Sequence, residues 1–234
     1  MRILAVDTAT FSCGVALLEG DQVVFKSVHV SRETHSRRLM PMIDNALQTT
    51  GLTVHHIDGF AVTKGPGSFT GLRIGISTVQ GLAAAMQKPV VGISALDALA
   101  WPFYSSAMPV CVLMDARKGE VYTCRYRPDG KTLKKTDTEE AMPPDAALKD
   151  IHEPSVLVGS GAVAYKEVIK KQVGANAVFA PPFQNMIDPA IIGHQGLAQL
   201  IIGQIDAPDT IAPTYLRQPD AVINRQKAAV SSKQ

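Results

Sequence analysis

The sequence predicts an α/β fold in which each half of the chain forms a mixed sheet that begins with a β-meander. In residues 1–104, apolar runs and amphipathic stretches follow one another in the order βββαβαβα. Strands that alternate with helices in this way form mixed sheets with helices packed against them. The second half also opens with an apolar strand and a hairpin partner, and the first strand of each half ends in an aspartate, Asp7 and Asp115. This repetition indicates a duplicated lobe.

Five short apolar runs separated by turn residues predict the strands of the first half, at residues 2–8, 12–18, 22–30, 59–63 and 89–93. The first three are joined by tight connections, which predicts an antiparallel meander. Apolar residues at helical spacing predict helices at 35–50, 70–86 and 95–104. Gly51 follows the first of these helices and suits its C′ position. We therefore place the N-terminal lobe at residues 1–104.

The second half predicts a C-terminal lobe at residues 105–220. Its strands are expected at 109–115, 120–127, 132–136 and 155–158, and its helices near 144–149, 162–172 and 188–203. Asp188 and Pro189 suit the N-cap and first position of the last helix, which is expected to be able to pack back on the first lobe. Residues 221–234 are polar and are expected to form a flexible tail.

The composition restricts the class of protein. With 234 residues, 46% of them hydrophobic, the chain can bury the core of one large domain or of two lobes. A formal net charge of +2 gives no electrostatic case for direct nucleic-acid binding. Asp7 interrupts the first apolar segment, and no run approaches the roughly 18 residues of a membrane span, so neither a signal peptide nor a membrane segment is predicted. Cys13, Cys111 and Cys124 lack Cys-x-x-Cys spacing and suit reduced thiols in the cytoplasm.

A glycine-rich turn lies between the predicted strand at 59–63 and the helix that follows it. Its residues are Gly65, Pro66, Gly67 and Ser68. Glycine tolerates positive φ, proline fixes its own φ, and Ser68 or Thr70 can cap the helix, so the stretch suits a structural turn. A strand, a turn and a helix N-terminus also gather backbone N–H groups that suit a phosphate or carboxylate. Both interpretations stay open, although no Gly-Lys-Ser/Thr closes the turn as a Walker loop would require.

A residual nucleotide or magnesium site has five weak candidates. They are Asp7, Thr8, Asp115, Gly159 and Gly161. Strand-end carboxylates can hold hydrated Mg²⁺ near a nucleotide, but they equally cap the next turn. The glycine pair can support an adenosine or simply begin a helix. No His-x-x-x-His or Gly-x-Ser-x-Gly pattern occurs, so neither a metal site nor a hydrolase nucleophile is predicted, and we assign no catalytic residue and no cofactor.

The surfaces of the two long helices in the first half suit close helix packing. Gly71, Gly75 and Thr78 lie at spacings of four and three, and Leu82 continues the row. Such small residues let another helix approach closely. That helix is either the one at 35–50 or part of a second protein, on an interface of roughly 1,600 Å². The partner-binding candidates are His35, Leu39, Met42, Ile43, Gly71, Arg73, Gly75, Thr78 and Leu82.

Four motifs in this order resemble the TsaB (YeaZ) family, the bacterial accessory proteins for threonylcarbamoyladenosine formation in tRNA. They are residues 3–10, the block 65–75, residues 115–122 and residues 215–217. The central block is the specific one, and residues 132–188 carry little of the resemblance. The resemblance implies the two-lobed actin-like ATPase (ribonuclease H-like) superfold.

The resemblance also implies a non-catalytic role. The related catalytic subunit TsaD carries a His-x-x-x-His iron site, and this chain places Ala95 and Leu99 in the corresponding positions, where neither can ligate a metal. Family members pair with TsaD through N-terminal-lobe helices, are joined by the ATPase TsaE, and self-associate through the same region. We therefore expect TsaD and TsaE as partners, a homodimer in isolation, and tRNA contact only through the complex.

Two alternative functions follow from the same relationship. A metal-dependent glycopeptidase-like hydrolase predicts stoichiometric metal in the purified protein. A small ATPase or kinase predicts ATP binding by the isolated chain, because Asp7 and Asp115 would then face a nucleotide cleft.

Overall fold

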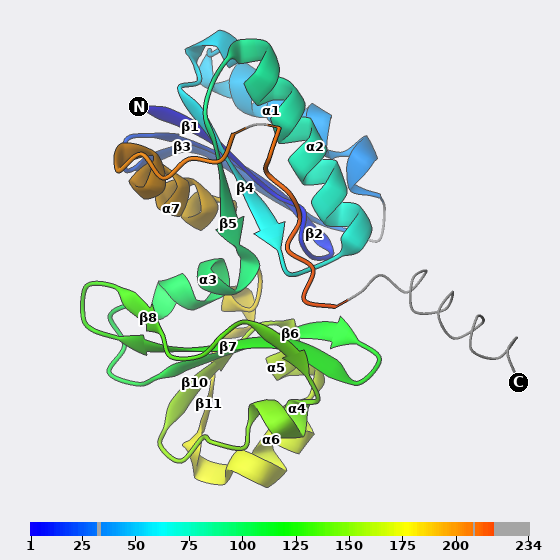
Figure 1. Cartoon of the computed structure of the whole chain (residues 1–234), viewed down its shortest axis with the longest axis vertical. Helices are drawn as coiled ribbons and strands as arrows, with labels where there is room; N and C mark the ends of the chain where they lie inside the picture. The colour runs from blue at the N-terminus through cyan, green and yellow to red at the C-terminus, as the bar shows by residue number, and fades with distance from the viewer. Residues whose placement is uncertain (32–33, 208, 218–234) are drawn as a thin grey trace, which may run out of the picture.

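The computed structural model describes residues 1–31, 34–207 and 209–217 of the chain. Two sheets with their helices form two lobes along the long axis of the molecule (Figure 1). The strand order is β3-β2-β1-β4-β5 in the first sheet and β11-β10-β6-β7-β8 in the second, where β9 also pairs with β7. The predicted α/β architecture with two mixed sheets is confirmed.

The first sheet begins with the predicted meander. β1 (Arg2–Asp7), β2 (Ser12–Glu19) and β3 (Gln22–Val30) are antiparallel, and β4 (Gly59–Gly65) and β5 (Val90–Ser94) add in parallel beyond β1. Apolar side chains point to both faces of β1, because both faces of this sheet are covered by helices.

Two long helices cover one face of the first sheet. They are α1 (Leu39–Thr50) and α2 (Phe69–Met86), and they lie side by side in Figure 1. The helix predicted from residue 35 begins later than expected, because a separate turn, η1 (His35–Arg37), precedes α1. Gly51 follows α1 with φ of 66°, as predicted for a C′ glycine. A further turn, η2 (Val54–His56), leads into β4.

The second sheet is built around a long hairpin. Its strands are β6 (Val110–Arg117), β7 (Glu120–Pro128), β8 (Leu133–Lys135), β9 (Glu140–Met142), β10 (Ser155–Val158) and β11 (Ala177–Phe179). The sequence did not reveal β9 and β11, because three residues show no alternating pattern and, unlike β8, neither strand follows a hairpin turn that the sequence indicates.

The helices of the second lobe are short. They are α4 (Pro144–Ala147), α5 (Ser160–Ala164) and α6 (Lys166–Val173), with single turns η4 (Gly174–Asn176) and η5 (Pro182–Gln184). The single helix predicted at 162–172 is divided at Tyr165, whose φ of −105° and ψ of 23° interrupt the helical path.

Two helices join the lobes through a shared core. α3 (Ala95–Ala100), followed by η3 (Trp101–Phe103), lies between the sheets, and α7 (Pro189–Ile201) packs on the open face of the first sheet. Asp188 caps α7 by accepting a hydrogen bond of 2.9 Å from the amide of Ala190. One apolar cluster contains side chains from both sheets and both helices.

The described C-terminal segment (residues 204–207 and 209–217) runs along the first lobe and ends at the second. The amide of Thr214 donates to Lys64 O over 2.7 Å. Arg217 Nη1 then donates to Ala116 O in β6 over 3.1 Å. The segment thus bridges both lobes beside α2 (Figure 1). The tail predicted at 221–234 lies outside the described residues. Within the described part, no helix combines the length and apolar character needed to cross a membrane.

Candidate functional site

The glycine-rich turn packs against the β1–β2 connection. The amide of Ser68 donates to Ala9 O over 2.7 Å, and a Cβ on Gly67 would lie 2.3 Å from the same oxygen. Ser68, rather than Thr70, is the N-cap of α2, since its Oγ accepts from the amide of Gly71. The Ser68 amide and hydroxyl are therefore both hydrogen-bonded within the chain, as expected for a structural turn.

The inner face of α2 is in direct contact with Thr8. A Cβ on Gly71 would lie 2.1 Å from Thr8 O, and one on Gly75 would lie 2.2 Å from Thr8 Oγ1. The Thr8 hydroxyl donates to Gly71 O over 2.8 Å. The sequence makes both glycines partner-binding candidates and leaves a contact within the chain as the alternative; these contacts favour that alternative. Both are buried, and a Cβ on either would come nearest to Thr8 at the end of β1, with the His35 ring 3.1 Å from the one on Gly71.

Asp7 is enclosed at the end of β1, with no side-chain surface exposed. Its Oδ1 accepts hydrogen bonds from Thr63 Oγ1 (2.6 Å) and from the amide of Ala9 (3.1 Å). Its Oδ2 is buried and has no hydrogen-bond partner among the described residues. Burial raises the pKa of this carboxyl to about 6, against a smaller lowering by the Thr63 hydrogen bond. In this conformation the carboxylate is not open to a hydrated cation.

The second-lobe candidates also take part in local structure. Asp115 Oδ1 accepts from the amide of Arg117 over 2.9 Å, and so closes the β6–β7 turn. A Cβ on Gly159 would lie 2.5 Å from Leu113 O, and one on Gly161 would lie 2.8 Å from the same atom. Because α5 begins so close to β6, both positions need glycine for packing.

An open groove lies on the outer face of the first lobe, between the start of α1 and the first turns of α2. Its volume is about 520 Å³. It is lined by Ser36, Leu39, Met40, Phe69, Thr70, Arg73, Ile74, Ser77 and Thr78. Three of the predicted partner-binding residues, Leu39, Arg73 and Thr78, lie in this lining.

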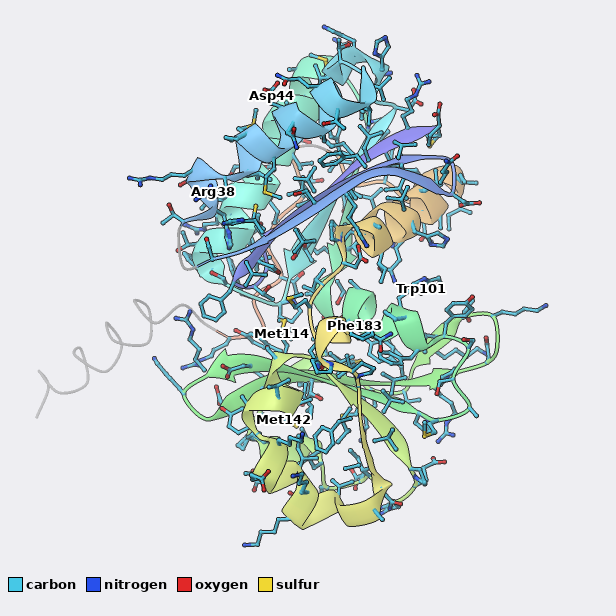
Figure 2. All side chains as sticks on the ribbon, turned by 180° about the vertical axis from the view of Figure 1, so that it is seen from behind. Arg38, Asp44, Trp101, Met114, Met142 and Phe183 are labelled. Carbon is cyan, nitrogen blue, oxygen red and sulfur yellow. The ribbon has the colours of Figure 1, made fainter. Side chains whose placement is uncertain are left out.

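The remaining partner-binding candidates do not line the groove. Ile43 is buried in the core beneath α1, and Met42 and Leu82 are half-buried against that core. His35 lies beside the groove, where its Nε2 is 2.9 Å from Thr10 O. Figure 2 shows that the side chain of Arg38, at the start of α1, projects away from the sheet.

An aromatic and cationic cluster forms one rim of the groove. The rings of Phe69 and Tyr215 are stacked with centroids 4.9 Å apart. The guanidinium carbon of Arg73 lies 4.1 Å from the Phe69 ring centroid, and Arg73 Nε donates to the Tyr215 hydroxyl over 3.1 Å. Sequence reasoning missed Phe69 as a site residue, although it lies four positions before Arg73 and therefore on the same helix face.

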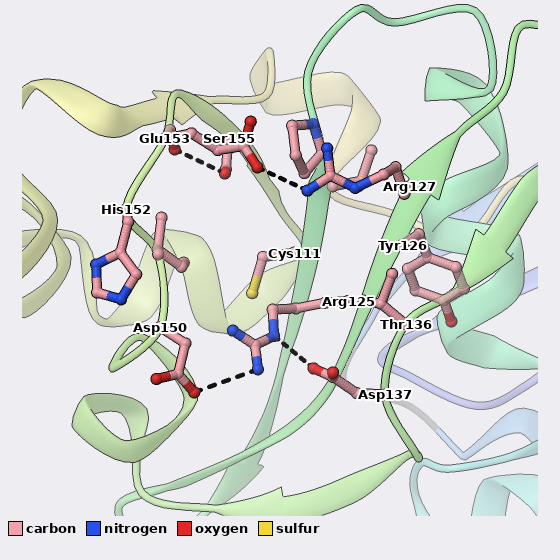
Figure 3. Close-up of a pocket in the computed structure, with 13 residues that line it drawn as sticks. Cys111, Arg125, Tyr126, Arg127, Thr136, Asp137, Asp150, His152, Glu153 and Ser155 are labelled. Carbon is pink, nitrogen blue, oxygen red and sulfur yellow. Dashed lines mark hydrogen bonds and ion pairs between the residues drawn. The ribbon is translucent and has the colours of Figure 1, made fainter.

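A second pocket, of about 250 Å³, lies at the edge of the second lobe (Figure 3). Its guanidinium groups are already paired: Arg125 with Asp137 and Asp150, and Arg127 with Glu153 over 2.6 Å. The neighbouring Cys111 is buried, and desolvation raises the pKa of its thiol to about 12. These are properties of a structural ion-pair cluster rather than of an anion site or a reactive thiol.

No three or more His, Cys, Asp or Glu side chains among the described residues are grouped so that they could hold a metal. Ala95 and Leu99, the residues at the positions of the implied histidine pair, are buried in α3 within the shared core.

Comparison with known proteins identifies relatives over nearly the whole length. Residues 28–224 match the family described as TsaD, tRNA N6-adenosine threonylcarbamoyltransferase. The Escherichia coli protein named tRNA threonylcarbamoyladenosine biosynthesis protein TsaB is 34% identical, over 93% of this chain and 95% of its own. The structure of YeaZ from Pseudomonas aeruginosa superposes with a TM-score of 0.76 at 30% identity, over 92% of this chain and 99% of that one. Component A of the Acidaminococcus fermentans (R)-2-hydroxyglutaryl-CoA dehydratase shares the fold alone, with a TM-score of 0.51 at 10% identity over 86% and 99%.

Proposed function

Since this chain belongs to the TsaB family, whose members act in tRNA threonylcarbamoyladenosine biosynthesis, we propose that it is the non-catalytic subunit of the enzyme that transfers the threonylcarbamoyl group to adenosine of tRNA. In this role it binds and organises the catalytic subunit TsaD and the ATPase TsaE. It contacts tRNA only within that assembly, acts in the cytoplasm, and forms a homodimer when isolated.

The observation that carries the proposal is the open groove between α1 and α2. Apolar side chains of Leu39, Met40 and Ile74 lie in it beside hydroxyl groups and one guanidinium. An apolar centre with a polar edge is the usual composition of a protein–protein interface. A pair of helices from a partner can lie against such a surface and complete a four-helix arrangement.

The residues that an active relative would use for catalysis have structural roles in this chain, which supports an organising role rather than an independent activity. Asp7 is enclosed, and the glycines of the second lobe serve packing against β6. A glycopeptidase would need ligands where Ala95 and Leu99 stand, and their methyl and isobutyl groups cannot bind a metal. Purified protein that hydrolyses a glycoprotein or ATP without partners would contradict this part of the proposal.

The docking test uses Ser77→Arg. Ser77 is exposed and lines the groove, so a long cation there obstructs docking without entering the core. We expect the variant to keep the thermal midpoint of the wild type but to bind TsaD at least roughly 30-fold more weakly, as loss of a central contact region does. The matched control is Val168→Arg, which puts the same cation on an exposed position of α6 in the second lobe.

Cells depleted of the protein extend this test to function. Wild-type chain and Val168→Arg should restore threonylcarbamoyladenosine in tRNA, measured by mass spectrometry of nucleosides, whereas Ser77→Arg should not. Full rescue by Ser77→Arg, together with unchanged co-purification of TsaD, would show that docking takes place elsewhere.

A further inference from the structure

An exposed aromatic side chain lies at the junction of the two lobes. Phe11, in the β1–β2 turn, is 62% exposed, and the guanidinium carbon of Arg117 is 5.6 Å from its ring centroid. Arg117 lies at the tip of the β6–β7 hairpin, where residues 117–119 have φ of 61°, 53° and 80°. Arg117 and Lys118 are non-glycine residues in the left-handed region, and they form this tight basic tip. Neither the core nor the α1–α2 groove uses Phe11.

This pair continues into the cluster at the groove. Arg217 binds Ala116 O, next to Arg117, and Tyr215 stacks on Phe69 two residues earlier in the C-terminal segment. Two groups of rings and guanidinium groups, Phe11 with Arg117 and Phe69 with Arg73 and Tyr215, are thus linked through Arg217 at the lobe junction. We call this set of residues the rim. The rim consists of Phe11, Phe69, Arg73, Arg117, Tyr215 and Arg217.

The rim is basic although the whole chain is close to neutral. It contains three arginines, and Lys118 follows Arg117 at the exposed hairpin tip. Two acidic residues lie at the hairpin. Glu120 Oε2 is 3.5 Å from Arg217 Nη1, and the Asp115 carboxylate accepts a hydrogen bond from the Arg117 amide. Cations outnumber acids locally, so a formal net charge of +2 does not exclude an anion-binding surface at this place.

We propose that the rim contacts an unpaired segment of the tRNA when the chain is part of the threonylcarbamoyl-transfer complex, an inference that rests on the proposed function. Exposed aromatic faces interleaved with guanidinium groups are the recurring means of holding unstacked bases and their phosphates. In the rim, Phe11 would stack on a base, while Arg117 would contact the adjoining phosphate.

RNA fits these observations better than an acidic peptide. The carboxylates of an acidic peptide would bind the arginines but would make no contact with the ring of Phe11, which is 62% exposed. Phe69 and Arg73 also line the groove, whereas Phe11 and Arg117 lie outside that lining. An RNA strand can therefore contact Phe11 and Arg117 while a partner occupies the groove.

The test measures tRNA binding by the assembled complex with a transcript that it modifies. Phe11→Ala removes the exposed ring, and Arg117→Asn removes the cation while retaining a residue that tolerates the left-handed backbone. The controls remove the same kinds of group away from the rim, in the second lobe: Phe183→Ala, at a 74% exposed ring in η5, and Arg127→Asn, at the edge of the second pocket.

We expect Phe11→Ala to weaken tRNA binding roughly 10-fold, the loss typical of one stacked base. Arg117→Asn should weaken it and reduce the slope of log K against log salt by about 0.7 to 0.9, the value of one phosphate contact. Both controls should bind like the wild type, and all four variants should assemble with TsaD at normal stoichiometry.

Wild-type tRNA affinity and salt slope in both rim variants would overturn the inference. Weaker TsaD binding with unchanged tRNA affinity would also overturn it, and would assign the rim to a protein partner. If no complex forms even with the wild type, the proposed function fails. If the complex forms and binds tRNA equally well with both rim variants, only the inference about the rim fails.

Discussion

The two faces of α2 differ in what they contact and in what they can tolerate. On the inner face, Gly71 and Gly75 meet Thr8 with no room for a side chain. On the outer face, Arg73 and Ser77 are exposed and line an open groove. Both pairs have the same spacing of four residues. The spacing of residues along the helix therefore does not tell which face is closed within the chain and which is open to a partner.

This comparison implies a division of roles along one helix. The inner face fixes α2 to β1 and to the glycine-rich turn, which holds the outer face in a defined position. Under the proposed function, the outer face would bind its partner with little reorganisation, which favours affinity. Substitutions on the two faces should consequently affect different measurements: stability on the inner face, binding on the outer one.

The largest effects are expected on the inner face, from Gly75→Arg and Gly71→Ala. A Cβ on Gly71 would lie 2.1 Å from a backbone oxygen, so α2 or β1 must shift. For Gly71→Ala we expect a loss of at least about 3 kcal/mol in the free energy of unfolding, measured by urea denaturation. Gly75→Arg, which would force a long cation into the same contact, should not fold. A stable, folded Gly75→Arg protein would show that the inner face is not closed.

The next effect concerns Asp7, also on the inner side. Its folded pKa of about 6 exceeds the ordinary value of 3.8, so the folded protein binds more protons than the unfolded chain between these pH values. Its stability should therefore fall as pH rises from 4 to 6 and level off above. Asp7→Asn removes the charge, and should stabilise the protein at pH 7 by about 2 kcal/mol but not at pH 4. Urea denaturation across this range checks it; an equal effect at both pH values would contradict burial as the cause.

A smaller effect is expected from Tyr215→Ala on the outer side. The variant loses the stacked pair with Phe69 and the hydrogen bond from Arg73. Since Tyr215 is 38% exposed, we expect a loss of only about 1 kcal/mol, seen as a small decrease in the thermal midpoint. Faster amide exchange should be confined to the C-terminal segment. A loss as large as that of Gly71→Ala would mean that this segment is part of the core.

The smallest effect, and the opposite sign, is expected from Gly81→Ala. Gly81 is in α2 like the inner glycines, but it is exposed, and a Cβ there would meet nothing within 4 Å. Alanine favours the helix over glycine, so the variant should be more stable by about 0.5 to 1 kcal/mol. It is also the matched control for Gly71→Ala, because it makes the same substitution in the same helix. Destabilisation would indicate a contact of the outer face within the chain.

Sequence patterns predicted much of the fold. The meander, the glycine after α1 and the Asp188 cap of α7 follow from short-range rules and are confirmed. Strands β9 and β11 escaped prediction because their pairing, rather than a periodic pattern, defines them. The break at Tyr165 was likewise not visible in the apolar spacing.

The candidate site was predicted only in part. Leu39 and Thr78 were proposed from helical spacing, Arg73 lies in the block that resembles the family, and all three line the groove. Phe69 and Tyr215 were not recognised as a pair, because 146 positions separate them and only the C-terminal segment brings them together. Spacing also could not show that Gly71 faces inward, because residues three or four positions apart share a helix face whether that face is buried or exposed.

By itself, the sequence determined the class of fold, the order of the elements in the first lobe, the membership of the TsaB family and the lack of metal-binding side chains at residues 95 and 99. The tertiary structure decided which face of α2 is closed against Thr8, that Asp7 is enclosed, and that aromatic and basic side chains from both lobes meet at one rim. The reason is physical: local propensities and periodicity act over a few residues, whereas burial and surface continuity depend on which distant segments pack together.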